Sequence, residues 1–223
     1  DVFYHDPDTL YISFHQDGRT LYPGTGFMDE FGGPQAIGAN IDIPLPPGTG
    51  DEGLLKVMSE LVLPILHEFK PDIVINSAGQ DNHFSDPLAN MNVTAKGYAE
   101  LVDLLQADIA VLEGGYSVQE ALPYVNTGII LSMAGLDYSR VIEPNYVEQH
   151  QSADVTRYID DLILKWKDQW ARREEIARDE LIGHKDRLVR DYSVYYDESG
   201  VQEERRETVR LYPDKIGWHS IES

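Results

Sequence analysis

Short apolar segments alternate with helical patterns through the middle of this 223-residue chain, and this alternation constrains its fold more than any other feature. The segments 72–77 and 108–113 have the length and apolar character of buried strands, and helical patterns over 95–106 and 117–133 follow them. Strands that alternate with helices form parallel sheets whose two faces the helices cover. We therefore predict an α/β fold with a mostly parallel sheet, in which functional sites lie at the carboxyl ends of the strands.

Two further strands and one helix are predicted before this region. Residues 9–14 and 37–45 are rich in β-branched, aromatic and other apolar side chains, and the glycine- and proline-rich stretch 17–35 between them is typical of a long loop. Apolar residues at helical spacing over 52–69 predict a helix that Asp51 caps.

The last third of the chain has a different character. A long polar helix is predicted over 153–181, and the strand-like segments 188–196 and 208–212 predict a β-hairpin. We therefore divide the chain into an α/β body, residues 1–150, and an appended helix and hairpin, residues 151–223. The appendage offers surface for a homo-oligomer, although no heptad pattern fixes a register.

The charge of the chain limits its partners. The net charge is −21, and residues 1–150 hold only five of the 18 basic residues but 22 of the 39 acidic ones. A field of this sign repels phosphate backbones and attracts cations, so we expect no direct nucleic-acid binding and consider a cationic substrate. Solubility explains the same charge equally well.

The composition limits the chemistry and the compartment. The chain has no cysteine, which excludes disulfides, thiolate zinc sites and cysteine nucleophiles and fits a reducing cytoplasm. No uninterrupted apolar window approaches the length of a membrane span, and the first residues carry no signal-peptide pattern. We therefore expect a cytoplasmic protein with no membrane contact.

Two strand ends carry residues suited to chemistry. Asp81 and His83 follow the strand 72–77 and are potential zinc ligands, although Asp, Asn and Ser are equally common in turns. Gly114, Gly115 and Tyr116 follow the strand 108–113, where a tight turn could aim a phenol at a developing oxyanion. Taken alone, this second motif is more often a strand-to-helix turn with a buried tyrosine.

The order of several motifs is more specific than any one of them. The motifs are LYISFHQ from Leu10, LYPGTG from Leu21, NIDIPLPPGTGD from Asn40, SAGQD from Ser77 with Asp86-Pro87-Leu88, and LEGGYS from Leu112. Together they resemble the histone deacetylase superfamily over about residues 1–136. The resemblance implies a zinc-dependent amidohydrolase of the arginase/deacetylase fold that removes acetyl groups from lysine side chains or polyamines.

The resemblance also implies roles for individual residues. Asp81 matches a zinc ligand, Tyr116 the tyrosine that hydrogen-bonds the tetrahedral intermediate, and Gly114, Gly115 and Tyr22 the channel for the acetylated side chain. Two monovalent-cation sites, with K⁺ as the candidate ion, are implied at Ser13 and Phe14 and at Phe3, Asp6 and Thr9. Gln80 and Asn82 depart from the family pattern, in which an apolar and a small residue are common.

Other expected parts of a deacetylase site are missing from this chain. In the family, two catalytic histidines and an Asp-x-His pair of zinc ligands precede the region that this chain matches. One carboxylate cannot hold a catalytic zinc, so we expect the chain to be the C-terminal part of a deacetylase and inactive alone.

Two other functions stay open. One is a non-catalytic, deacetylase-like module that binds acetylated or cationic ligands or serves in assembly. The other is a manganese ureohydrolase on the related fold, although such an enzyme needs additional Asp-x-Asp or Asp-x-His pairs.

Overall fold

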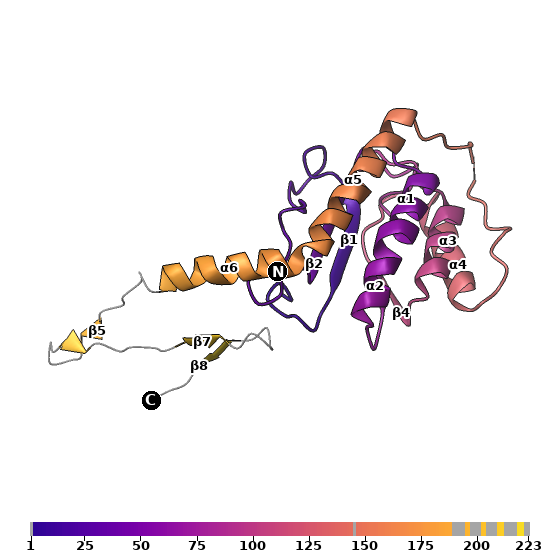
Figure 1. Ribbon diagram of the computed structural model, residues 1–223. Coiled ribbons are helices and arrows are strands. Elements are labelled where there is room, and N and C mark those ends of the chain that lie inside the picture. The colour runs from indigo at the N-terminus through magenta and orange to yellow at the C-terminus, as the bar shows by residue number, and fades with distance from the viewer. Residues whose placement is uncertain are drawn as a thin grey trace. The chain divides into compact units, whose positions relative to one another are not determined.

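The computed structural model describes residues 2–144 and 146–188 and four short strands beyond them, with side chains through residue 180 (Figure 1). Two compact units share these residues. The larger unit contains residues 12–30 and 42–169, and the smaller contains residues 1–11, 31–41 and 170–223. The elements up to the last long helix are β1 (Tyr11–Gln16), β2 (Asn40–Leu45), α1 (Asp51–Val57), the π-helical turn η1 (Met58–Val62), α2 (Leu63–Phe69), β3 (Ile75–Ala78), α3 (Ala95–Leu105), β4 (Ile109–Leu112), α4 (Leu122–Met133), α5 (Ala153–Ala171) and α6 (Arg173–Leu188).

Strands β3 and β4 confirm the predicted parallel pairing. Ile75 pairs with Ile109 and Ala78 with Leu112, so both strands end at the same edge. The chain crosses from one strand to the next through α3, which contacts α4 (Figure 1). Thr94 caps α3 by accepting a hydrogen bond from the Gly97 N–H at 3.1 Å.

The strand pair leaves much of its apolar surface open. Ile75, Val111 and Leu112 are exposed, whereas α3 and α4, which contact each other, both contain buried residues. Parallel strands in complete α/β domains are covered on both faces. The described residues therefore leave an apolar surface of β3 and β4 uncovered.

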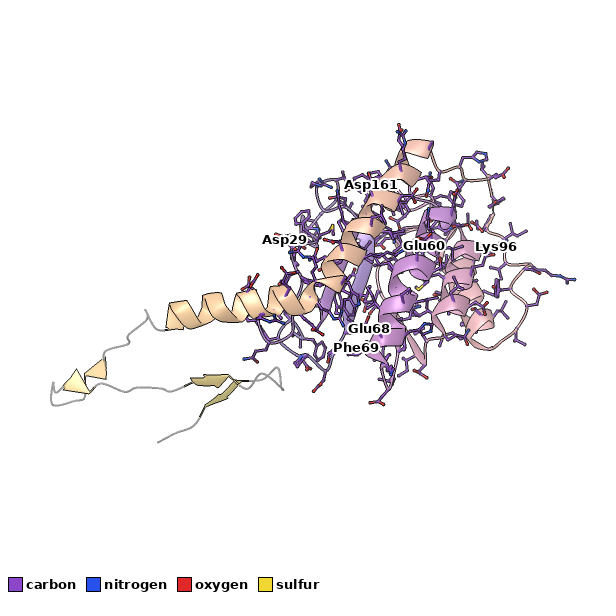
Figure 2. The ribbon with its side chains drawn as sticks, viewed as in Figure 1. Asp29, Glu60, Glu68, Phe69, Lys96 and Asp161 are labelled. Atoms are coloured by element: carbon purple, nitrogen blue, oxygen red, sulfur yellow. The ribbon has the colours of Figure 1, made fainter. Side chains whose placement is uncertain are left out.

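The helix predicted over 52–69 is confirmed as the continuous run α1, η1 and α2. Its apolar side chains at positions 54, 57, 58, 61, 62 and 65 are buried. Helix α5 lies against this run through an ion pair of Lys56 with Asp160 and another of Lys167 with Glu60 at 3.3 Å. Figure 2 marks Glu60 on η1 and Asp161, the neighbour of Asp160, on α5.

A partly buried carboxylate joins the first turns of α1 and α3. Asp51 accepts hydrogen bonds from the N–H of Thr94 at 2.8 Å and from its hydroxyl at 2.6 Å. A Cβ on Gly97 would lie 2.0 Å from Asp51 Oδ1, so only glycine fits beside this carboxylate. Burial raises the pKa of Asp51 despite these hydrogen bonds.

Some predicted boundaries and pairings are wrong. Helix α4 begins at Leu122 rather than at 117, and the single helix predicted over 153–181 is two helices, α5 and α6. The strand near the chain start begins at Tyr11, two residues later than predicted.

The pairing predicted for the C-terminal hairpin is also wrong. Strand β5 (Tyr195–Tyr196) pairs with β6 (Gln202–Glu203), and β7 (Val209–Leu211) pairs with β8 (Trp218–Ser220), both antiparallel. The segment 208–212 therefore belongs to a second hairpin. The remainder of 188–196, and the turn at 197–200, fall largely outside the described residues. No helix in the described part of the chain is long and apolar enough to span a membrane.

Candidate functional site

The candidate site forms where β3 and β4 end side by side. The loop after β3 carries Asp81, and the loop after β4 carries Gly114, Gly115 and Tyr116. The N–H of Gln80 donates a hydrogen bond to the carbonyl oxygen of Gly114 at 2.6 Å, which joins the two loops directly beyond the strands. The parallel register therefore brings together the two strand ends that the sequence singled out.

Glycine allows the two loops to touch. A Cβ on Gly114 would lie 2.8 Å from Oδ2 of Asp81 and 3.7 Å from the hydroxyl oxygen of Tyr116. Gly115 has a φ angle of +144°, and a Cβ there would lie 2.9 Å from the Cβ of Gln80. The carboxylate and the phenol thus flank a single glycine, and any side chain at Gly114 would displace the carboxylate.

The Asp81 carboxylate is partly buried and available for a ligand. Burial raises its pKa, and the negative charge of Asp86 adds to this effect, while His15 opposes it. Within the side chains described, no donor from another residue hydrogen-bonds or ion-pairs with the carboxylate. A buried carboxylate without a cation is suited to bind one.

The side chain and the backbone of Tyr116 have different surroundings. The side chain is 53% exposed, so its hydroxyl can reach a ligand. The backbone N–H donates a hydrogen bond to Oδ2 of Asp86 at 2.8 Å. The interpretation of this motif as a turn with a buried tyrosine is wrong, because the ring stays accessible while the main chain is held.

His83 does not act with Asp81 as a metal-ligand pair. Its imidazole is fully buried, with Nδ1 2.9 Å from Ser85 Oγ and Nε2 3.3 Å from Oε1 of Glu143. The latter is an ion-pair distance, although the ring N–H is not aimed for a hydrogen bond. Because the Ser85 N–H also points at Nδ1, at 3.2 Å, we assign the ring proton to Nε2, beside Glu143.

Glu143 was not singled out by the sequence. Burial tends to raise its pKa, but His83 and backbone N–H groups, including that of Ala95 at 3.3 Å, lower it overall. The residue lies between α4 and α5, 60 positions after His83, so no local motif links the two. Asp86 was noted only as part of a motif, and its contact with Tyr116 was equally unpredicted.

The other predicted positions have their own surroundings. Tyr22 is 91% exposed. Ser13 precedes Phe14 in β1, and its hydroxyl oxygen lies 2.9 Å from His15 Nδ1. In the smaller unit, Thr9 donates a hydrogen bond to Asp6 at 2.9 Å, and the Asp6 N–H donates to the Phe3 carbonyl oxygen at 3.0 Å.

Comparisons with known proteins identify the family of this chain. The family model of the histone deacetylase domain matches residues 1–132. A probable deacetylase of Archaeoglobus fulgidus is 49% identical over 159 residues, which is 67% of this chain and 44% of that protein. The chain therefore spans less than half of this relative's length.

Two solved structures resemble the fold. The crystal structure of the HDA15 HD domain has a TM-score of 0.65 at 28% identity and covers 82% of this chain and 49% of its own. The acetylpolyamine aminohydrolase of Burkholderia pseudomallei has a TM-score of 0.53 at 30% identity and covers 60% and 39%. From the matched domain and these likenesses, the chain belongs to the histone deacetylase domain family.

Proposed function

We propose that this chain is the C-terminal part of a zinc-dependent deacetylase that hydrolyses acetyl-amide groups on cationic molecules, either lysine side chains or polyamines. The observation that carries the proposal is the position of Gly114, where the Asp81 carboxylate and the Tyr116 hydroxyl approach the same point. One group can hold a metal and the other can donate a hydrogen bond, and both lie within 4 Å of the position that a Cβ would take at Gly114.

Zinc fits this chain through one ligand. The Asp81 carboxylate is partly buried, and no cation is described beside it. Both properties suit a carboxylate that binds a metal. However, no group of three His, Cys, Asp or Glu residues that could hold a metal comes together among the described residues. Catalytic zinc uses three protein ligands and a water, so the other ligands have to come from additional protein. When bound, zinc polarises a carbonyl and lowers the pKa of its water to about 7.

Tyr116 supplies the second part of the chemistry. Its phenol O–H donates a hydrogen bond to the acetyl oxygen, which gains negative charge as water attacks the carbonyl carbon. Such a donor accelerates the reaction because it stabilises the oxyanion more than the neutral carbonyl. The exposed ring can reach a substrate, and the anchored backbone limits the positions from which it donates.

The open strand pair supports the view that more protein completes the domain. Ile75, Ile109, Val111 and Leu112 are exposed on β3 and β4, which is unusual for parallel strands. The archaeal relative is more than twice as long as the segment matched here. We propose that the additional part of such a domain covers the exposed surface of β3 and β4 and supplies the missing zinc ligands.

The acidity of the chain favours a cationic substrate. The net charge of −21 produces a field that attracts an ammonium group and repels nucleic acid. An acetylated lysine side chain in a basic peptide and a partly acetylated polyamine both satisfy this condition.

A second candidate is a binding module that holds acetylated ligands without hydrolysing them. It is favoured by the finding that the described side chains include no set of three metal ligands. The two candidates differ in whether the complete gene product carries the remaining ligands.

The test is to express the longest polypeptide that the gene encodes and to measure its intact mass, its zinc content and its release of acetate. The substrates are an acetyl-lysine peptide and an acetylated polyamine, each with and without a chelator. About one zinc per polypeptide, with hydrolysis that stops on chelation, would support the proposal. A longer product that binds no zinc, or binds zinc and releases no acetate, would overturn it in favour of the binding module.

A further inference from the structure

We propose that Asp86 is a positioning residue, which fixes the main chain of Tyr116 and so sets where its phenol donates. The inference rests on the role proposed for Tyr116. Asp86 is buried, and its two carboxylate oxygens bond in different directions. Oδ1 accepts the N–H groups of Leu88 at 2.9 Å and Ala89 at 3.4 Å, and Oδ2 accepts the Tyr116 N–H at 2.8 Å.

One carboxylate therefore holds the loop after β3 in its turn and holds the loop after β4 against it. A neutral amide cannot replace it, because asparagine has one acceptor oxygen and an NH₂ group. If that oxygen keeps the turn, the NH₂ group faces the Tyr116 N–H, donor against donor. If the oxygen turns toward Tyr116, the contacts with Leu88 and Ala89 are lost instead.

A second hydrogen bond joins the same two loops. Ser85 Oγ is 2.8 Å from Ser117 Oγ, so adjacent residues of one loop hold adjacent residues of the other. Behind Ser85 lies His83, and behind His83 lies Glu143. With the ring proton on Nε2, Nδ1 accepts from the Ser85 hydroxyl, which leaves Ser85 Oγ to accept from Ser117.

The tyrosine needs such anchors because two glycines precede it. Gly114 and Gly115 have no side chains through which packing could fix this loop, and glycine is the most flexible residue of the backbone. A displacement of a catalytic group by about 1 Å can reduce the rate about a hundredfold. The contacts of Asp86 are thus placed where a small shift would alter the reaction.

Asp86→Asn tests this anchor by two measurements. The first is amide hydrogen exchange at Tyr116 in the chain itself, which needs neither zinc nor activity. We expect exchange to become about tenfold to a hundredfold faster, the scale of a lost hydrogen bond to a charged group. The second is turnover of the complete enzyme, where we expect kcat to fall about tenfold to a hundredfold with KM changed less than threefold.

The matched control is Asp137→Asn. Asp137 accepts the Ser139 N–H at 2.9 Å in an exposed turn after α4 and belongs to no contact of the site. It should change neither measurement. Asp86→Asn also removes a charge that raises the pKa of Asp81. Ser85→Ala is therefore the second variant, because it removes the hydrogen bond between Ser85 and Ser117 without altering charge. We expect it to speed Tyr116 exchange several-fold.

The outcomes separate this inference from the proposed function. Unchanged exchange of the Tyr116 amide in Asp86→Asn would overturn the inference that Asp86 anchors this loop. Faster exchange with an unchanged kcat would overturn the inference that the anchor affects catalysis. A complete enzyme that is inert even without substitutions would overturn the proposed function and the catalytic part of the inference together. The exchange data would then still decide whether Asp86 holds the loop.

Discussion

The inner and outer sides of the candidate site differ in how many contacts with distant residues hold their polar groups. On the inner side, Asp86, Ser85 and Glu143 each contact a partner from a distant part of the chain. On the outer side, no donor from another described residue contacts the Asp81 carboxylate, and the side chain of Tyr116 is exposed. The chain thus fixes the backbone of the site firmly and leaves the groups that meet a ligand open.

This difference indicates which substitutions should affect chemistry and which should affect folding. Changes on the outer side should alter zinc binding or turnover and leave stability nearly unchanged. Changes on the inner side should alter stability, and activity only through the position of Tyr116.

The largest expected effect is on the outer side. Tyr116→Phe removes the proposed donor and should lower kcat of the complete enzyme by about two to three orders of magnitude, the cost of one lost oxyanion donor. The matched control is Tyr146→Phe, whose ring is 48% exposed, close to that of Tyr116. Steady-state kinetics with an acetyl-lysine peptide checks this, and equal turnover of the two variants would remove Tyr116 from the mechanism.

Gly114→Ala should have the next largest effect. The new methyl group would lie 2.8 Å from Oδ2 of Asp81 and force the carboxylate to move. We expect activity about a hundredfold lower and weaker zinc binding in the complete protein. Gly79→Ala is the control, because its Cβ would meet Asp81 Oδ1 at an ordinary 3.5 Å. Zinc titration and kinetics of both variants separate them, and identical behaviour would contradict the geometry.

On the inner side, Glu143→Ala should destabilise the chain by about 1–3 kcal/mol, because it removes the carboxylate beside the buried His83 ring and leaves the buried N–H of Ala95 without its acceptor. The pKa of Glu143 is lowered by folding, so its ionised form stabilises the chain above its ordinary pKa of 4.5. That contribution is lost as the pH falls through the lower folded value. Urea unfolding at pH 7, 5 and 3.5 should show the difference from the unsubstituted chain shrinking with acid. The exposed Glu148→Ala should show no such trend.

The smallest effect is expected at Tyr22. Its side chain is 91% exposed and packs on little, so Tyr22→Ala should change the unfolding free energy by less than about 0.5 kcal/mol. If it lines the substrate channel, KM of the complete enzyme should rise several-fold. A large loss of stability would show that the outer side is more ordered than its exposure indicates.

Local patterns predicted most of the fold around the site. The helices over 51–69 and 95–105 and the parallel pair β3 and β4 follow from apolar spacing and length. The start of α4 was missed because residues after Tyr116 look helical, yet Ser117 bonds to Ser85 and the helix begins only at Leu122, one residue before Pro123.

The chemistry of the site was less accessible from sequence. Asp81, Gly114 and Tyr116 were identified because they stand at strand ends and match a known family. Glu143 and the anchoring role of Asp86 were not, because their partners lie 60 and 30 positions away and no spacing rule connects them. Such contacts depend on tertiary packing, which also decides that His83 is structural.

The carboxylate shared by the first turns of α1 and α3 contributes more to the stability of the fold as the pH falls. Folding raises the pKa of Asp51, so the stability linked to this group is greatest below pH 3.8 and declines as the pH rises through the folded value. Glu143, whose pKa folding lowers, contributes a pH dependence of the opposite sign. The pH dependences that these two carboxylates add to the stability of the fold therefore have opposite signs.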